Sequence, residues 1–170
     1  YRRVTYYTTL AAALATCGVR VLLIDGDMEL LPGFLPVALA KLAAEPHLAG
    51  VAGLVEDTTV VNSFDRYRVA NGAWNVPLPA ARWLNGSGLY RRAAIDSCGG
   101  YVSDRNLRGW EEAELGMRLT TYGWHLERID LPSTLHTGHS EGSWALLHSL
   151  WRSRRAMANG VLIRQAAGKR

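Results

Sequence analysis

Residues 21–29 read VLLIDGDME, and this stretch decides the fold. A continuous apolar run that ends in a turn is typical of a strand buried on both faces, the kind found in parallel sheets. The turn is Asp25-Gly26-Asp27, here called the DGD motif, and α/β proteins place their ligands at this carboxyl edge of the sheet. Because burying an unpaired carboxylate is costly, Asp25 and Asp27 are expected to face solvent, a cation or a metal-bound ligand. An ordinary Asp-Gly turn is the alternative.

The composition indicates one globular domain. Of the 170 residues, 48% are hydrophobic and 20% are charged, which is enough apolar material for a single core. The formal net charge is only +4, and the excess of arginine gathers at residues 152–170, so we expect no nucleic-acid partner. Cys17 and Cys98 have neither metal-ligand spacing nor a disulfide pattern, which is consistent with a reducing, cytoplasmic compartment. No transmembrane span is predicted.

Apolar periodicity and turn residues predict alternating helices and strands. Helices are expected at residues 5–17, 32–44, 92–97 and 111–122 and from Ser143 onward. Strands are expected at 19–24, 48–55, 81–84, 88–91 and 124–129, with loops at 101–109 and 132–142 and no clear pattern at 56–75. This alternation favours an α/β sheet. Because the best buried strand comes so early, we expect strands that flank it to precede Tyr1, so that the sheet is incomplete at its N-terminus.

The predicted helix at 111–122 begins with three carboxylates. The helix dipole favours acidic residues at a helix N-terminus, which accounts for part of this pattern. Glu114 and Arg118 stand four residues apart, in the order that favours an ion pair. Successive residues turn by about 100° around a helix, so Glu112 projects away from the side shared by Glu111 and Glu114. Since Glu112 has no evident partner in its own helix, we predict that it points toward the DGD motif.

Trp110 and a histidine-containing loop are further candidates for a site. Trp110 stands directly before the three carboxylates, a composition typical of a site for a polar ring, although core packing is the commoner role of tryptophan. Residues 135–142 read LHTGHSEG and follow the last predicted strand. A neutral imidazole from His136 or His139 could bind a metal there, and a surface or hydrogen-bonded histidine is the alternative.

In this order, the motifs resemble those of GT-A glycosyltransferases of the family 2 type, and the second half is also similar to the polypeptide N-acetylgalactosaminyltransferases. The resemblance covers about residues 8–143, and four segments in this order are a fairly specific match. The segments are the DGD strand with Pro32 and the leucine-rich helix after it, NGSGLYRR at 85–92 ahead of GGY at 99–101, WEEAEL at 110–115 ahead of Arg118 and Leu119, and YGW at 122–124 ahead of HTGH at 136–139.

The resemblance implies a mixed, mostly parallel GT-A sheet flanked by helices. It also implies the metal-dependent transfer of a sugar from a nucleotide-diphosphate sugar to an acceptor hydroxyl. By this resemblance Asp27 and His139 hold a Mn²⁺ or Mg²⁺ ion, with His136 as the competitor of His139, and Asp25 is the carboxylate nearer the ribose. A hard divalent cation suits oxygen ligands and stabilises the charge that gathers on a diphosphate leaving group.

The resemblance also implies roles near the sugar and the acceptor. Glu112 stands where many family members carry the aspartate that acts as base, so its longer side chain is a departure from the family. Glu111 matches an acceptor-side glutamate, and Trp110 belongs with it among the substrate-binding residues. The match to a glycine-rich loop near the sugar covers Gly86, Ser87 and Gly88. The resemblance identifies neither the donor sugar nor the acceptor.

Residues 1–143 are accordingly expected to form the C-terminal part of a GT-A catalytic domain, and residues 144–170 a basic amphipathic tail. The family's N-terminal strands, which bind the base of the donor, are missing from this sequence. The chain alone is therefore expected to bind nucleotide-sugar poorly, to transfer no sugar, and to leave a sheet edge or apolar patch exposed. The tail either lies on an anionic membrane, at its cytoplasmic face, or packs on the domain.

Two alternatives come from other functional classes. Residues 22–27, LLIDGD, also resemble the nucleophile strand of the haloacid dehalogenase phosphatases. Met28 departs from that pattern, and Lys41 lies too near to serve as its later lysine. A non-catalytic sugar-binding module is the other alternative. Phosphate release from a phosphoester, compared with hydrolysis of a sugar nucleotide, would separate the two enzymes.

Overall fold

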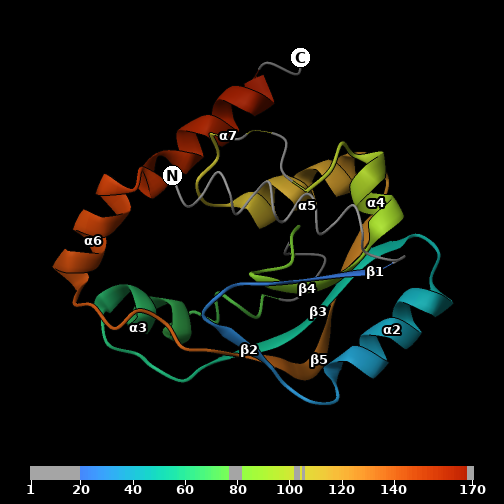
Figure 1. Ribbon diagram of the computed structural model, residues 1–170, viewed down its shortest axis with the longest axis horizontal. Coiled ribbons are helices and arrows are strands. Elements are labelled where there is room, and N and C mark those ends of the chain that lie inside the picture. The colour runs from blue at the N-terminus through green and yellow to red at the C-terminus, as the bar shows by residue number, and fades with distance from the viewer. Residues whose placement is uncertain (1–19, 77–81, 102–103, 105, 168–170) are drawn as a thin grey trace.

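The computed structural model describes residues 20–76, 82–101, 104 and 106–167, and this part of the chain has a mixed α/β fold (Figure 1). Its strands are β1 (Arg20–Ile24), β2 (Met28–Leu30), β3 (Leu48–Asp57), β4 (Ser87–Arg91) and β5 (His125–His136). Its helices are α2 (Phe34–Ala44), α3 (Ser63–Ala70), α4 (Arg92–Ser97), α5 (Glu111–Thr121), α6 (Ser143–Arg152), the 3-10 helix η1 (Arg155–Met157) and α7 (Ala158–Ala167).

The five described strands form a sheet in the order β1-β4-β3-β5-β2. β4 pairs antiparallel with both β1 and β3, β2 pairs antiparallel with β5, and β3 pairs in parallel with β5. The expectation of a mostly parallel sheet is therefore wrong for the described residues. Burial of an apolar run indicates what covers a strand, but it does not fix the direction of the strand beside it. Among the described strands, β1 lies at one edge of the sheet.

Helices cover both faces of the sheet (Figure 1). On one face, Val21 of β1 belongs to a buried cluster that includes Leu115 of α5 and residues of α4. On the other face, Leu22 packs against a cluster built around Phe34 and Leu42 of α2. Alternate side chains of a strand point to opposite faces, so the apolar run of β1 contributes to both layers. This packing fixes the end of β1, where the DGD motif begins.

The sequence predicted most of the described elements to within two residues: β1, α2, β3, β4, α4, α5 and the start of α6. The predicted loop at 132–142 is wrong in its first part, because residues 132–136 continue β5. The register between β3 and β5 shifts around Leu54 and its partner Pro132, and such irregularities accommodate a residue without an N–H. Residues 82–84 form no strand, which corrects the prediction at 81–84, while residue 81 and the predicted helix at 5–17 lie outside the described residues.

The helices after β5 pack back toward the start of α5. Ala158 at the start of α7 is buried, and a Cβ placed on Gly109 would lie 3.8 Å from its Cβ. Farther along, Arg164 Nη2 lies 3.9 Å from Asp104 Oδ2. Within the described residues, none of the helices has the length and apolar character needed to cross a membrane.

Candidate functional site

The DGD motif forms the connection between β1 and β2, and its backbone is tied to two other strands. The N–H of Asp25 donates to the carbonyl of Gly86 at 2.8 Å, directly before β4. The carbonyl of Asp27 accepts from the N–H of Thr137 at 2.9 Å, directly after β5. The three motif residues are exposed, so a ligand can reach both carboxylates. The motif is therefore held in place by the sheet and open to solvent.

Four carboxylates from the DGD motif and from the first turn of α5 interact electrostatically; we call Asp25, Asp27, Glu111 and Glu112 the acid cluster. Asp25 is exposed as a residue, but protein surrounds much of its carboxyl group; this desolvation, and then the charges of Asp27 and Glu111, raise the pKa of Asp25 to about 6. Burial, and then the charge of Asp25, raise the pKa of Glu112 to about 7. The structure thus brings together the carboxylates that the sequence placed in two separate motifs.

One cation from the C-terminal helices acts on the acid cluster. Arg155 in η1 lowers the pKa of both Asp25 and Glu112, against the larger effects of burial and neighbouring acids. Sequence analysis placed Arg155 only in a basic tail. The sequence could not single out Arg155 as a site residue, because three arginines lie at 152–155 and nothing in their order distinguishes one of them.

The acidic residues in the first turn of α5 have different partners. Trp110, directly before the helix, has a left-handed backbone with φ of 65° and is half exposed. This conformation is unfavourable for a bulky residue, and it sets the direction in which α5 leaves the loop. Glu114 is buried and accepts a 2.7 Å hydrogen bond from Nε of Arg118, as the sequence predicted. Glu112 instead interacts with Asp25, on the side of the DGD motif.

The histidine that contacts the DGD motif is His136. Its Nε2 lies 3.4 Å from Oδ2 of Asp27, and its Nδ1 lies 2.7 Å from Oδ1 of Asp57. His139 was the preferred metal ligand by resemblance; its Nδ1 is buried and has no hydrogen-bond partner among the described residues. In that same part of the chain, no three or more His, Cys, Asp or Glu side chains form a group arranged to hold a metal ion. The role of His139 stays a prediction.

In comparisons with known proteins, no family model and no curated protein matches this chain. The assignment of function therefore depends on the acid cluster and its surroundings.

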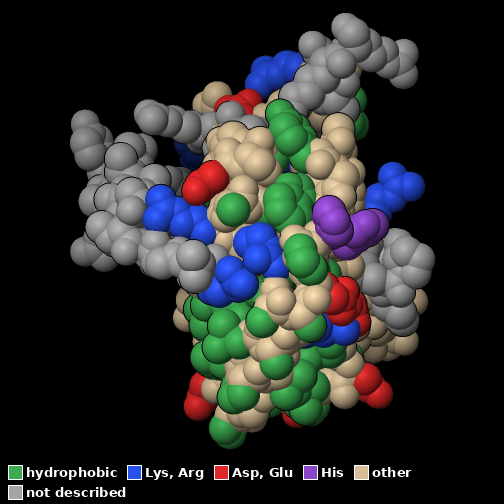
Figure 2. Space-filling model, turned by 90° about the vertical axis from the view of Figure 1, so that its right-hand side faces the viewer, with side chains coloured by type: hydrophobic (Ala, Val, Ile, Leu, Met, Phe, Trp, Pro, Cys, Tyr) green, Lys and Arg blue, Asp and Glu red, His purple; other side chains and the backbone are tan. Residues whose placement is uncertain are grey.

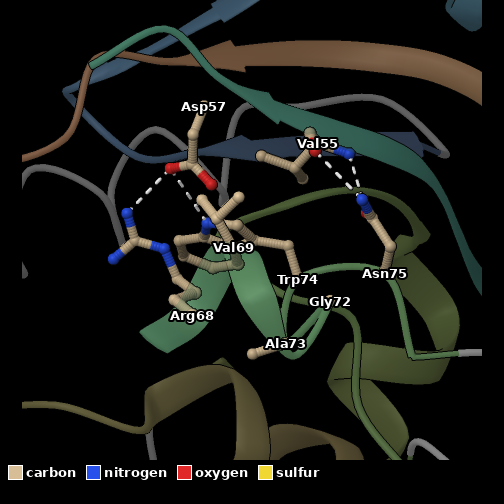
Figure 3. A pocket seen from close by; sticks show the side chains of 8 residues that line it. All are labelled: Val55, Asp57, Arg68, Val69, Gly72, Ala73, Trp74 and Asn75. Atoms are coloured by element: carbon tan, nitrogen blue, oxygen red, sulfur yellow. Dashed lines mark hydrogen bonds and ion pairs between the residues drawn. The ribbon is translucent and has the colours of Figure 1, made fainter. Parts of the chain in front are cut away.

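A small cavity adjoins the His136 contact and is lined by residues that sequence analysis missed (Figure 3). Its volume is about 130 Å³. Asp57 accepts hydrogen bonds from Arg68 at 2.7 Å and from Nε1 of Trp74 at 3.4 Å. Burial alone would raise the pKa of Asp57, but the hydrogen bonds to Arg68 and His136 lower it. Asp57 therefore stays ionised and holds the ring of His136 in position beside Asp27.

Asp57 stands just after the carboxyl end of the predicted strand 48–55. Its place could have marked it as a site residue, because ligand-binding side chains gather at such ends. Arg68 and Trp74 carried no comparable signal. They lie in the segment without a clear pattern, which forms α3 after an asparagine cap: the side chain of Asn62 accepts the N–H of Asp65 at 2.9 Å. Their place beside Asp57 depends on how α3 packs against the end of β3.

The three residues of the predicted glycine-rich loop have different surroundings. Gly86 adjoins the acid cluster, because a Cβ there would lie 2.7 Å from Cγ of Asp25. Ser87 is buried in β4, and its hydroxyl lies 3.2 Å from that of Thr134. A Cβ on Gly88 would lie 2.9 Å from the ring of Tyr90. Gly86 thus leaves room for a site carboxylate, whereas Ser87 and Gly88 pack inside the sheet.

A methyl group at Gly86 is expected to displace the carboxylate of Asp25. In a Gly86→Ala variant the added Cβ overlaps the side-chain end of Asp25, an exposed residue whose side chain can turn away toward solvent. Movement into water reduces desolvation, so the pKa of Asp25 should fall from about 6 toward its ordinary value of 3.8. Carbon-detected NMR titration of the Asp25 carboxyl measures this shift.

The control for this variant is Gly142→Ala, because a Cβ at Gly142 has no neighbour within 4 Å and the backbone there has an ordinary φ of −65°. This control should leave the titration of Asp25 unchanged. An unchanged pKa in Gly86→Ala would show that the glycine does not shape the acid cluster.

Proposed function

We propose that this chain carries the catalytic carboxylates of a metal-dependent glycosyltransferase with a GT-A fold. The enzyme would transfer a sugar from a nucleotide-diphosphate sugar to an acceptor hydroxyl. The observation that carries the proposal is that the first turn of α5 meets the DGD motif, so that Glu112 interacts with the charge of Asp25; there, burial and then this charge raise the pKa of Glu112 to about 7. A carboxylate with a pKa near neutrality, placed beside the ligand-accessible carboxylates of Asp25 and Asp27, is suited to proton transfer at a substrate.

In the proposed reaction Glu112 acts as the general base. Its carboxylate accepts the proton of the acceptor hydroxyl as the hydroxyl oxygen bonds to the anomeric carbon of the donor sugar. The bond between that carbon and the diphosphate oxygen breaks, and the diphosphate leaves with the bonding electron pair. Arg155 lies close enough to affect Asp25 and Glu112, so its positive charge is available to the leaving diphosphate.

The side chains near the DGD motif include the donor types that a hard divalent cation accepts, although the described residues do not bring three of them into one ready-made group. Asp25 and Asp27 offer carboxylate oxygens. Residues 136–139 offer imidazole nitrogens: Nε2 of His136 lies beside Asp27, and Nδ1 of His139 has no hydrogen-bond partner within the described part of the chain. Mn²⁺ and Mg²⁺ accept such ligands and take further oxygens from phosphates and water. When bound, the cation supplies positive charge to the diphosphate. Asp57 fixes the orientation of His136 by its 2.7 Å contact to Nδ1.

The phosphatase alternative is less well supported. It needs a lysine beside the DGD carboxylates, and Lys41 is the lysine that the described residues contain. Its Nζ lies 2.9 Å from Oε1 of Glu127 and 3.2 Å from Oε1 of Glu45. These partners hold Lys41 against β5 at the C-terminal end of α2, and they account for its charge without a role in phosphate chemistry.

An Asp27→Asn substitution in the full-length protein tests the metal site. Neutralising this carboxylate is expected to weaken Mn²⁺-dependent binding of the nucleotide-sugar by about a hundredfold or more, since loss of even an indirect ligand contact costs ten- to a hundredfold. Isothermal titration with a panel of nucleotide-diphosphate sugars, with and without Mn²⁺, measures the effect. His136→Ala and His139→Ala in the same assay separate the two imidazoles.

Glu29→Gln is the matched control, because Glu29 is an exposed carboxylate two residues farther along in β2. It should bind donor as the wild type does. Donor binding that is independent of Mn²⁺, or intact in Asp27→Asn, would contradict the proposed metal site. Release of inorganic phosphate from simple phosphoesters would favour the phosphatase instead.

A further inference from the structure

Helix α6 exposes an apolar face in addition to the one that it buries. Leu146 packs inward and is only 4% exposed. On the other side, the exposed fractions are 84% for Trp144, 43% for Leu147 and 64% for Trp151. With about 100° per residue, positions 144, 147 and 151 lie on one side of the helix and position 146 on the opposite side. A surface helix of a globular domain normally turns a polar face outward, so the outward face of α6 indicates a contact.

The start of α3 lies next to the start of α6 and carries exposed aromatic side chains of its own. The N–H of Ser63 donates to Oγ of Ser143 at 3.0 Å, and the two hydroxyl oxygens lie 2.9 Å apart, so α3 and α6 begin side by side (Figure 1). Phe64 and Tyr67 of α3 are exposed by 44% and 71%. We call the exposed faces of these two helices the α3–α6 surface; its members are Phe64, Tyr67, Trp144, Leu147 and Trp151.

Basic side chains accompany the α3–α6 surface. Arg152 and Arg154 are exposed at the end of α6 and directly after it, and Arg66 is exposed on α3, where its Nη1 donates to the carbonyl of Val61 at 2.8 Å. Asp65 of α3 is buried and paired with Arg68 at 2.9 Å, so Glu141, exposed two residues before α6, is the nearby carboxylate that offsets part of this charge. Aromatic and leucine side chains bordered by arginines are the composition of helices that lie in the interface of an anionic bilayer. An anionic lipid surface complements both the aromatic side chains and the arginines of this surface. An apolar protein surface would complement only the aromatic side chains.

We propose that the α3–α6 surface docks on an anionic lipid bilayer as a peripheral contact. The indole and phenol rings enter the level of the headgroups, and the arginines bind lipid phosphates beside them. The described helices do not cross the membrane, so this contact is reversible and depends on the surface charge of the lipid. The inference is independent of the proposed sugar transfer, because none of its residues belongs to the acid cluster.

Vesicle co-sedimentation of the full-length protein tests the proposal. The protein should bind phosphatidylcholine vesicles that contain phosphatidylglycerol and bind pure phosphatidylcholine vesicles far less, and added salt should release it. A Trp144→Ser/Trp151→Ser variant should bind these vesicles at least about tenfold more weakly, because it buries less apolar surface in the bilayer. An Arg152→Gln/Arg154→Gln variant should bind about twenty-fivefold more weakly, at about fivefold for each arginine near a charged surface.

A matched control comes from α2, which lies at the other end of the molecule from α6 (Figure 1). Val37 and Leu39 of α2 are exposed by 46% and 44%, close to the value for Leu147. Figure 2 shows this end of the molecule, where hydrophobic side chains gather in the lower half. A Val37→Ser/Leu39→Ser variant should bind anionic vesicles as the wild type does.

Three results would overturn the proposal. In the first, the tryptophan variant binds anionic vesicles as well as the wild type does. In the second, the wild type binds neutral and anionic vesicles equally, and in the third it binds neither. In the last case, a dimer that the tryptophan variant converts to a monomer in sedimentation velocity would assign the surface to a second copy of the chain. Because the vesicle assay uses no sugar donor, its failure leaves the proposed function untouched.

Discussion

Under the proposed function, replacing Glu112 with glutamine is expected to lower turnover of the full-length protein by about a hundredfold or more, the usual scale for loss of a positioned general base. Glutamine keeps the shape of the side chain but cannot accept the proton of the acceptor hydroxyl. Binding of the nucleotide-sugar should stay intact, because the DGD motif is unchanged. Steady-state kinetics at saturating donor, together with donor titration of the same variant, measure the two effects separately.

The pH profile gives a second test of the base. Burial and the charge of Asp25 raise the pKa of Glu112 to about 7, and only its deprotonated form can act as the base. Turnover of the wild type should therefore fall as the pH drops below about 7. Arg155 lowers this pKa, so Arg155→Gln should move the acid limb of the profile to higher pH.

The pH dependence of thermal stability checks whether the Glu112→Gln variant is folded. The pKa of Glu112 is above its ordinary value of 4.5, so ionisation in the folded state costs stability, and this cost develops as the pH rises from about 4.5 through about 7. Glutamine has no such cost. At pH values above that range, Glu112→Gln should therefore melt no lower than the wild type. Near-normal turnover in that variant, with donor binding intact, would falsify the assignment of the base.

Replacing Arg118 with methionine is expected to lower the free energy of unfolding by about 3–5 kcal/mol, the usual cost of breaking a buried ion pair from one side. The side chains of Arg118 and Glu114 are only 7% and 4% exposed. Arg118 also donates to three carbonyls in the turn after α4, those of Cys98 and Gly100 at 2.7 Å and of Tyr101 at 2.8 Å. Methionine fills much of the space but leaves the carboxylate and the carbonyls without these donors. Urea unfolding measures the loss.

The exposed pair between Arg92 and Asp96 is the matched control, since it has the same four-residue spacing and a distance of 3.2 Å. Asp96→Asn should change the free energy of unfolding by less than about 1 kcal/mol, because exposed pairs contribute little. A double variant, Glu114→Gln/Arg118→Met, should lose less than the sum of its single variants, because no buried charge is left unpaired. Additive losses would mean that the two side chains do not act as a pair.

The sequence by itself determined the features that depend on near neighbours. Apolar runs and turn residues placed β1, α2, α4 and α5 to within two residues, because each element is limited by local backbone preferences. The ion pair of Glu114 and Arg118 followed from the four-residue period of a helix. The same period separated Glu112 from Glu114, before any contact across the domain was considered.

Only the tertiary structure decided which segments meet. β4 lies antiparallel between β1 and β3, and this arrangement depends on how distant strands pair, which an apolar pattern does not encode. β5 continues past Pro132 because β3 is long enough to pair with it, and this extension brings His136 to Asp27. The contribution of Arg155 to the acid cluster depends on the return of the last helices to α5. These features rest on contacts between residues far apart in the chain, and short-range sequence patterns carry no information about them.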